Sequence, residues 1–279
     1  MNNSVFESYK DIHKGKRVFL IANGPSLADT NLDFLENEIS FAMNRISLLY
    51  NKFPKWRPTY YLFSSTNVKP HNPWGAEWLQ SVITSLSCDK TTSFISSVFK
   101  EYIDPHNSYP QVKWFNSMSE TKPDMNGNIS FDCFSPNVVE RIDKSGTSMN
   151  LALQLAYHMG FDEVIIVGAD LGWTADRGSK NDPNHFDKSY RANIPPEKVN
   201  KANHQMRNVH SLAYRYFLDK NQNTKIYNAS LKTVLDVYPI IDYEKYILDN
   251  VVEYDEKRME TAKSFWNRNH QFALESNNG

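Results

Sequence analysis

The sequence predicts an α/β fold, a doubly wound and mostly parallel sheet with a lid region. Two patterns predict it. Residues 17–22 form an apolar run that stops at Asn-Gly-Pro-Ser, which is typical of a buried strand ending in a sharp turn. Residues 144–172 hold a helical pattern, then a glycine, then a second apolar run. A helix, a glycine and a buried strand in this order make half of a βαβ unit, and such units build parallel sheets.

Polar residues follow each of the first three predicted strands. The strands span 17–22, 39–43 and 58–66, and the polar residues at their ends are Asn23, Asn44, Ser65 and Asn67. Because the carboxyl ends of strands in an open parallel sheet form a ligand crevice, we expect these side chains to line it. Amides suit ribose hydroxyls and base edges, since they both donate and accept hydrogen bonds. Asparagine also tolerates turn geometry, so a purely structural role stays open.

The turn after the first strand consists of Asn23, Gly24, Pro25 and Ser26. Such a turn exposes backbone N–H groups at a strand end, where anions bind. One glycine does not make a dinucleotide fingerprint, and no Gly-Lys-Ser/Thr follows as in a Walker loop. A plain structural turn is an equal alternative.

The clearest helix begins shortly after Lys144. Thr147 or Ser148 is a good N-cap, and Gly160 suits the end of the helix because glycine readily adopts the left-handed conformation. The free N–H groups and the dipole at the start of this helix favour a phosphate, and Lys144 adds a positive charge nearby. Simple capping is the alternative.

The apolar run after this helix ends in Gly168 and Asp170. A carboxylate at the end of a central strand can accept two ribose hydroxyls or hold a metal ion. The structural alternative is an N-cap for the segment that follows.

Residues 173–204 are polar and predict a lid, because long loops in compact domains are usually functional or disordered. His185 lies in this segment between Asp182 and Asp187. Histidine is a good general base at neutral pH. A merely solvated loop histidine and a metal-binding Asp-His-Asp cluster are the alternatives.

The remaining segments carry weaker patterns. Residues 68–135 predict mixed helix and strand with long loops, 204–221 a helix and 224–230 a last strand. The tail, 243–272, is charged and amphipathic, and a packing helix is favoured there over a membrane-surface helix.

The composition excludes several classes of protein. The formal net charge of -1 gives no reason to expect a nucleic-acid partner. No run of about 18 apolar residues predicts a membrane-spanning helix. The N-terminal stretch does not have the pattern of a secretory signal. Cys88 and Cys133 lack metal-ligand spacing, so we expect a cytoplasmic protein without a zinc site or disulfides.

The order of these pieces resembles the bacterial sialyltransferases of glycosyltransferase family 42. The matching pieces are ANGPSL (22–27), MNR (43–45), TSMNLALQLAYHMGFDEVIIVGADL (147–171), NDPNHF (181–186) and KIYNAS (225–230). The same pieces resemble the wider MptE-like family, which includes flagellin glycosyltransferases and an archaeal pterin diphosphokinase. The resemblance implies a Rossmann-like sheet of a GT-A-like variant.

The resemblance also implies roles for single residues. Asn23, Ser26 and Asn44 would hold the CMP part of a donor, Thr147 and Ser148 would lie beside the donor sugar, and Asp170 near the ribose or base. His185 would be the general base in the lid. The predicted substrate-binding set is Asn23, Gly24, Pro25, Ser26, Asn44, Ser65, Asn67, Lys144, Thr147, Ser148, Gly168, Asp170, Leu171 and Trp173.

The sequence departs from family 42 at two points. The stretch after the Asp170 strand reads LGWTADRGSK and lacks the family's tyrosines, which stabilise the leaving phosphate. A cation can offset that developing charge, so Trp173, Arg177, Lys180 or Lys188 is expected to take over. The family's arginine before Thr147 is absent, and Lys144 lies close to that position but out of register.

We therefore expect a glycosyltransferase that uses a CMP-activated acidic sugar, a nonulosonate such as sialic acid or Kdo. The resemblance implies an inverting displacement with no metal and no cofactor. The alternatives are an ATP- and Mg-dependent diphosphokinase and a non-catalytic nucleotide- or sugar-binding protein. The partners would be the CMP-sugar donor and a glycan or glycolipid acceptor. Peripheral membrane contact through the tail and a homo-oligomer stay open.

The expected organisation is a nucleotide-sugar-binding domain (1–172 plus 205–240), a lid (173–204) and a helical tail (241–279).

Overall fold

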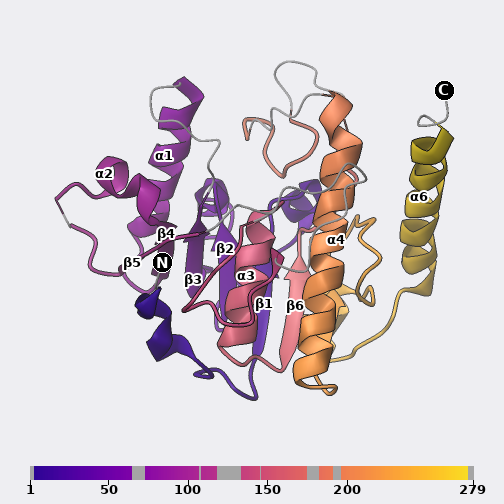
Figure 1. Ribbon diagram of the computed structural model, residues 1–279, viewed down its shortest axis with the longest axis horizontal. Coiled ribbons are helices and arrows are strands. Elements are labelled where there is room, and N and C mark those ends of the chain that lie inside the picture. Colours follow the sequence, from indigo (N-terminus) through magenta and orange to yellow (C-terminus); the bar gives the residue numbers. More distant parts are fainter. Residues whose placement is uncertain are drawn as a thin grey trace.

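Seven parallel strands form one sheet in the described part of the chain, in the order β5-β4-β3-β2-β1-β6-β7. The computed structural model describes residues 3–64, 73–106, 108–117, 133–144, 146–174, 182–190 and 196–275 (Figure 1). The strands are β1 Arg17–Ile21, β2 Ser40–Met43, β3 Tyr60–Phe63, β4 Thr92–Ser96, β5 Val112–Phe115, β6 Glu163–Val167 and β7 Lys225–Asn228.

The strand order reverses at β1. From β1 the chain builds outward to β5, and it then returns to the other side of β1 to form β6 and β7. In open α/β sheets the ligand crevice lies outside the carboxyl ends of the strands at such a reversal, so the ends of β1 and β6 are where a site is expected. The predicted doubly wound, Rossmann-like α/β fold is confirmed, and every strand pair in the described residues is parallel.

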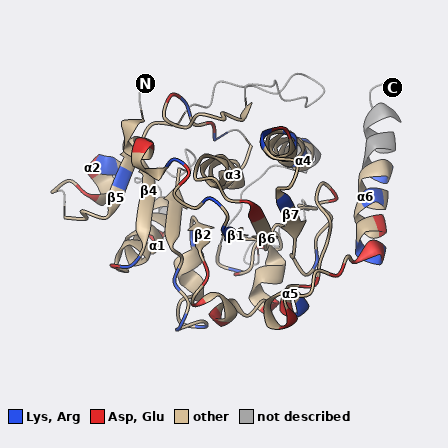
Figure 2. Ribbon diagram, turned by 90° about the horizontal axis from the view of Figure 1, so that it is seen from below, with Lys and Arg blue, Asp and Glu red and all other residues tan. Residues whose placement is uncertain are grey.

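Helices cover both faces of the sheet (Figure 2). In that view α3 and α4 lie on one face, and α1 and α5 on the other. The α-helices are α1 Pro73–Leu86, α2 Lys100–Ile103, α3 Ser148–His158, α4 Pro196–Lys220, α5 Tyr243–Asp249 and α6 Glu256–Glu275. Short 3-10 helices span Ser4–Tyr9, Pro25–Asp29, Leu32–Leu35, Ile46–Leu49 and Ser97–Phe99.

Each face of the sheet has its own hydrophobic core. Side chains alternate between the faces along a strand, so Val18 and Leu20 of β1 pack in the cluster with α3. Phe19 and Ile21 point the other way and pack in the cluster that contains Leu27 and Tyr246. These four side chains are buried, which is why Val18 to Ile21 form an unbroken apolar run in the sequence.

The predicted α3–β6 unit is confirmed in detail. Thr147 caps α3, and its hydroxyl oxygen accepts a hydrogen bond from the Met149 N–H at 3.2 Å. Gly160 follows the helix with φ +80°, the left-handed conformation predicted for it. Leu151 and Leu155 are fully buried against the sheet. The predicted strand 224–230 is also present, as β7.

Two predicted segments differ from the structure in their secondary structure. The lid, predicted as 173–204, is helical from Pro196 onward, because α4 begins there. The tail is two helices rather than one, and Asn250 ends α5 in the left-handed conformation with φ 50°. Strands and helices do mix in the described parts of 68–135, as predicted, and they form α1, β4, α2 and β5.

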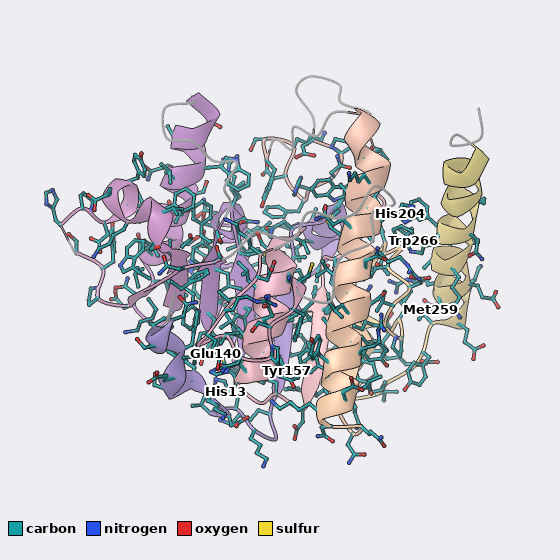
Figure 3. All side chains as sticks on the ribbon, in the orientation of Figure 1. His13, Glu140, Tyr157, His204, Met259 and Trp266 are labelled. Atoms are coloured by element: carbon teal, nitrogen blue, oxygen red, sulfur yellow. The ribbon has the colours of Figure 1, made fainter. Side chains whose placement is uncertain are left out.

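Trp266 of helix α6 contacts the segment after β7 and helix α4. This side chain is 5% exposed, and its Nε1–H donates to the Val234 carbonyl at 2.6 Å. Its ring lies 5.3 Å from that of His204 on α4, and Figure 3 shows the two side chains directed toward one another. This supports the packing interpretation of Trp266. None of the helices in the described residues is long and apolar enough to cross a membrane.

Candidate functional site

The turns after β1 and β6 meet at the point where the strand order reverses. The Ala22 N–H donates to the Val167 carbonyl at 2.8 Å, and the Gly24 N–H donates to the Gly168 carbonyl at 2.7 Å. A Cβ at Gly24 would lie 2.5 Å from the Gly168 oxygen and 2.7 Å from Asp170 Oδ2. Glycine is therefore required at position 24, because two segments of the chain approach closely there.

Asp170 fastens the predicted NGPS turn. Its Oδ2 accepts the Ser26 N–H at 2.6 Å, and its Oδ1 accepts the Ser26 hydroxyl at 2.5 Å. The side chain is buried, and burial raises the pKa of Asp170 against the two Ser26 hydrogen bonds, which favour the charged form. Both oxygens accept hydrogen bonds inside the protein, so Asp170 fixes the shape of the turn. Its predicted contact with a ribose or base stays a prediction.

Three N–H groups in and after the NGPS turn bond within the protein, which favours the structural alternative for these groups. The Gly24 N–H goes to Gly168, the Ser26 N–H to Asp170, and the Leu27 N–H to the Gly24 carbonyl. Pro25 has no N–H to give. The N–H groups of Gly24, Ser26 and Leu27 are thus used within the protein and are not free to bind an anion.

Asn23 does present a polar group without a partner. Its side chain is 8% exposed, and its buried Oδ1 has no hydrogen-bond partner among the described residues. Its backbone carbonyl accepts the Phe186 N–H at 3.1 Å. Buried polar atoms in native structures are almost always satisfied, so an orphan here indicates a place where a ligand or water donates.

The end of β2 meets the start of α3. Asn44 has φ 56°, and its side-chain Nδ2 lies 3.4 Å from the Ser148 hydroxyl. Ser148 is the first residue of α3, directly after the Thr147 cap. Lys144 lies just before that cap and is half-buried, and its burial lowers the pKa of the ammonium group although Asp143 acts in the opposite direction. A positive helix end and a lysine with a destabilised charge both favour an anion.

The chain leaves β6 through three residues with positive φ. They are Gly168 (φ 70°), Leu171 (φ 56°) and Gly172 (φ 68°). Leucine in the left-handed region is strained, and such strain concentrates at functional sites. Trp173 follows these residues. Its ring lies edge-on to that of His185, with the ring centroids 5.5 Å apart.

His185 is held rigidly rather than solvated. Its Nδ1 lies 2.8 Å from Asp182 Oδ2, and the side chain is only 11% exposed. Its ring stacks on Tyr190 with centroids 4.0 Å apart and an 8° angle between the planes. The alternative of a loosely solvated loop histidine is therefore wrong.

Two residues that the sequence analysis did not single out, Arg45 and Asn184, anchor the loop 182–190, and a third, Asn203, holds the backbone of Trp173. Arg45 follows β2 and is 5% exposed, and it donates to the Ser81 hydroxyl at 3.1 Å and to the Ser189 carbonyl at 3.0 Å. Asn184 bonds both backbone groups of Thr174, and Asn203 of α4 bonds both backbone groups of Trp173. The available signal for Arg45 was its place directly after the predicted strand and Asn44, in the MNR piece.

Several predicted residues lie outside the described part of the chain, namely Ser65, Asn67, Arg177 and Lys180. Lys188 is described and exposed, and its backbone carbonyl accepts the Asp182 N–H at 3.1 Å. The described residues hold no group of three or more His, Cys, Asp and Glu placed to bind a metal ion.

No family model matches the chain, and no curated protein does. Solved structures with a similar arrangement include the sialyltransferase CstII from Campylobacter jejuni in complex with the substrate analogue cytidine-5'-monophosphate. It is 14% identical over 81% of this chain and 84% of that chain, with a TM-score of 0.39. The sialyltransferase CST-II in complex with a trisaccharide acceptor and CMP is 16% identical over 76% of this chain and 80% of that chain, with a TM-score of 0.36. Likeness at these values carries no argument, so the function is argued from the residues of the site.

Proposed function

We propose that this protein is a glycosyltransferase that moves an acidic sugar from a CMP donor to a hydroxyl of a glycan or glycolipid. The donor sugar is a nonulosonate such as sialic acid, or Kdo. The observation that carries the proposal is the double anchoring of the loop 182–190. Phe186 bonds Asn23 at the end of β1, and Ser189 bonds Arg45 at the end of β2. His185 is thereby held beside the crevice to which Asn23, Asn44 and Ser148 contribute.

Different groups serve the two ends of the donor. The amides of Asn23 and Asn44 hold the cytidine, since each can both donate and accept. The phosphate and the sugar carboxylate lie toward the start of α3, with Ser148 and Lys144. Two observations support this arrangement. The Gly24 and Ser26 N–H groups are used within the protein, and Oδ1 of Asn23 has no partner among the described residues.

The reaction is one displacement. Nε2 of His185 takes the proton of the acceptor hydroxyl as its oxygen bonds the anomeric carbon. The bond from that carbon to the phosphate oxygen breaks, and CMP leaves with the electron pair. Lys144 and the helix N-terminus stabilise the charge that develops on the phosphate. A positioned base of this kind contributes about 10²–10⁴-fold to the rate.

A nucleotide titration tests the binding half of the proposal. We expect CMP and CDP to raise the melting temperature equally with and without magnesium, and UDP, GDP and ATP to do so weakly. A ligand at 100-fold its dissociation constant adds about 2.7 kcal/mol to the free energy of unfolding. Asn23→Ala should abolish the CMP shift, whereas Asn223→Ala, at an exposed turn before β7, should keep it. Stabilisation by ATP with magnesium alone would favour a diphosphokinase instead.

A further inference from the structure

The loop 182–190 contains a carboxylate and an imidazole in direct contact. Oδ2 of Asp182 lies 2.8 Å from Nδ1 of His185, and their side chains are 3% and 11% exposed. The other oxygen of Asp182, Oδ1, accepts the Asn184 N–H at 2.9 Å. Asn184 is itself buried and bonded to Thr174, so the carboxylate is fixed at both oxygens.

The imidazole ring is held from its sides as well. Tyr190 stacks on it in parallel, and Trp173 meets it edge-on with centroids 5.5 Å apart. Tyr190 is in turn packed by Trp78 at 5.4 Å and by the Arg45 guanidinium at 6.0 Å. Among the described residues, the charged groups recorded around the ring are thus Asp182 beside it and Arg45 behind Tyr190. A flip of the ring about its Cβ–Cγ bond would break the hydrogen bond to Asp182, and a tilt of the ring would break the stack on Tyr190.

We propose that Asp182 is the positioning residue of the reaction. Its carboxylate accepts the Nδ1–H of His185 and so fixes the tautomer in which Nε2 carries the lone pair. When Nε2 takes the proton of the acceptor hydroxyl, Asp182 stays ionised and stabilises the imidazolium. The proton is later released from Nε2 to water. The role of Asp182 in sugar transfer rests on the proposed function. The tautomer of His185 rests only on its contact with Asp182.

Asp182→Asn reverses the tautomer without removing the side chain. Because Oδ1 must still accept the Asn184 N–H, the amide nitrogen takes the place of Oδ2 and donates to Nδ1. His185 then carries its hydrogen on Nε2 and cannot act as a base. We expect kcat to fall by about 100-fold or more, with KM for the donor within about twofold of the wild type. Asp187→Asn is the matched control, because Asp187 bonds Ser189 in the same loop.

The nitrogen chemical shifts of His185, measured by NMR on the intact protein, test the proposal without any assay of activity. The expected wild-type spectrum has a protonated Nδ1 and an unprotonated Nε2, and Asp182→Asn should exchange the two. A wild-type ring protonated on Nε2 would overturn the proposal, even if the protein turns over CMP-sugars. The expected tautomer in a protein that turns over no CMP-sugar would instead contradict the proposed function and leave the positioning role intact. Should Asp182→Asn fail to fold, the wild-type spectrum alone decides.

Discussion

Asp170 and Ser26 are 144 positions apart in the sequence and share two hydrogen bonds, one to the Ser26 N–H and one to its hydroxyl. The pair joins the end of β6 to the turn after β1, at the point where the strand order reverses. The NGPS turn therefore owes its shape to a residue that follows another strand. The first two predictions concern this junction.

Asp170→Asn should destabilise the fold and weaken CMP binding together. An asparagine offers one acceptor where two are needed, so one buried donor of Ser26 loses its partner at a cost of about 1–3 kcal/mol. Urea denaturation measures the loss in the free energy of unfolding. Ser26→Ala completes a double-mutant cycle, and we expect strong coupling between the two changes. Simple additivity would show that the pair does not act as a unit.

Gly24→Ala should destabilise the protein by steric conflict. Its φ of −67° suits any residue, so the cost comes from the Gly168 oxygen 2.5 Å from the new Cβ, and we expect about 1–3 kcal/mol. Gly15→Ala is an instructive control, because it has open space around it but φ +80°. Both variants lose stability in denaturant titrations, but only Gly24→Ala should lose CMP affinity. Equal CMP binding by the two would argue against a ligand at this turn.

Lys144→Gln should weaken CMP binding through the phosphate. Loss of a hydrogen bond to a charged group is worth about 1.5–3 kcal/mol, which corresponds to roughly 10- to 100-fold in the dissociation constant. Cytidine, which has no phosphate, should bind both proteins alike in calorimetric titrations. Lys225→Gln, at the exposed start of β7, is the matched control. If the Lys144 variant weakened cytidine as much as CMP, the lysine would not be a phosphate ligand.

His210 should make the protein sensitive to mild acid. It is buried beside the Tyr238 hydroxyl at 3.0 Å, and burial lowers the pKa of His210 to about 3. The unfolded chain binds this proton near the ordinary pKa, so stability is present above about pH 6.5 and is lost as the pH falls. From pH 7 to pH 5 the loss from this group is about 2 kcal/mol. His210→Gln should show a correspondingly shallower dependence of its free energy of unfolding on pH.

Two other histidines contribute to the pH dependence of both proteins, the buried His158 and the half-buried His13. Burial also lowers the pKa of His13 and of His158, and both contributions are the same in the wild type and in His210→Gln. The difference between the two pH curves therefore belongs to His210. Parallel curves would mean that His210 is charged in the folded protein at pH 5.

The sequence predicted the features that depend on neighbouring residues. Thr147 caps α3 and Gly160 ends it through contacts within a few positions, and the apolar run of β6 reports its burial on both faces. The features it missed depend on long-range contacts. Nothing near Ser26 signals that its N–H is taken by Asp170, and nothing near Arg45 signals that Ser189 is its partner.

His185 shows which features of a site can be predicted from the sequence and which cannot. Residue type and a polar setting were enough to single out His185 as a candidate base. The stack on Tyr190 joins positions within the same loop, and the edge contact with Trp173 joins that loop to the segment after β6. Whether such a ring is held or solvated is decided by how the loop folds back on itself, which periodicity and composition do not encode.

Release of CMP from CMP-activated sugars in the presence of EDTA tests the central claim most directly. CMP-sialic acid and CMP-Kdo are each incubated with the wild type and with His185→Gln, and CMP is quantified over time. The account predicts CMP release by the wild type in EDTA and a rate lower by about 10²–10⁴-fold in the variant, which still binds CMP. Equal rates for the two proteins, or no release from either sugar by a wild type that binds CMP, would contradict it.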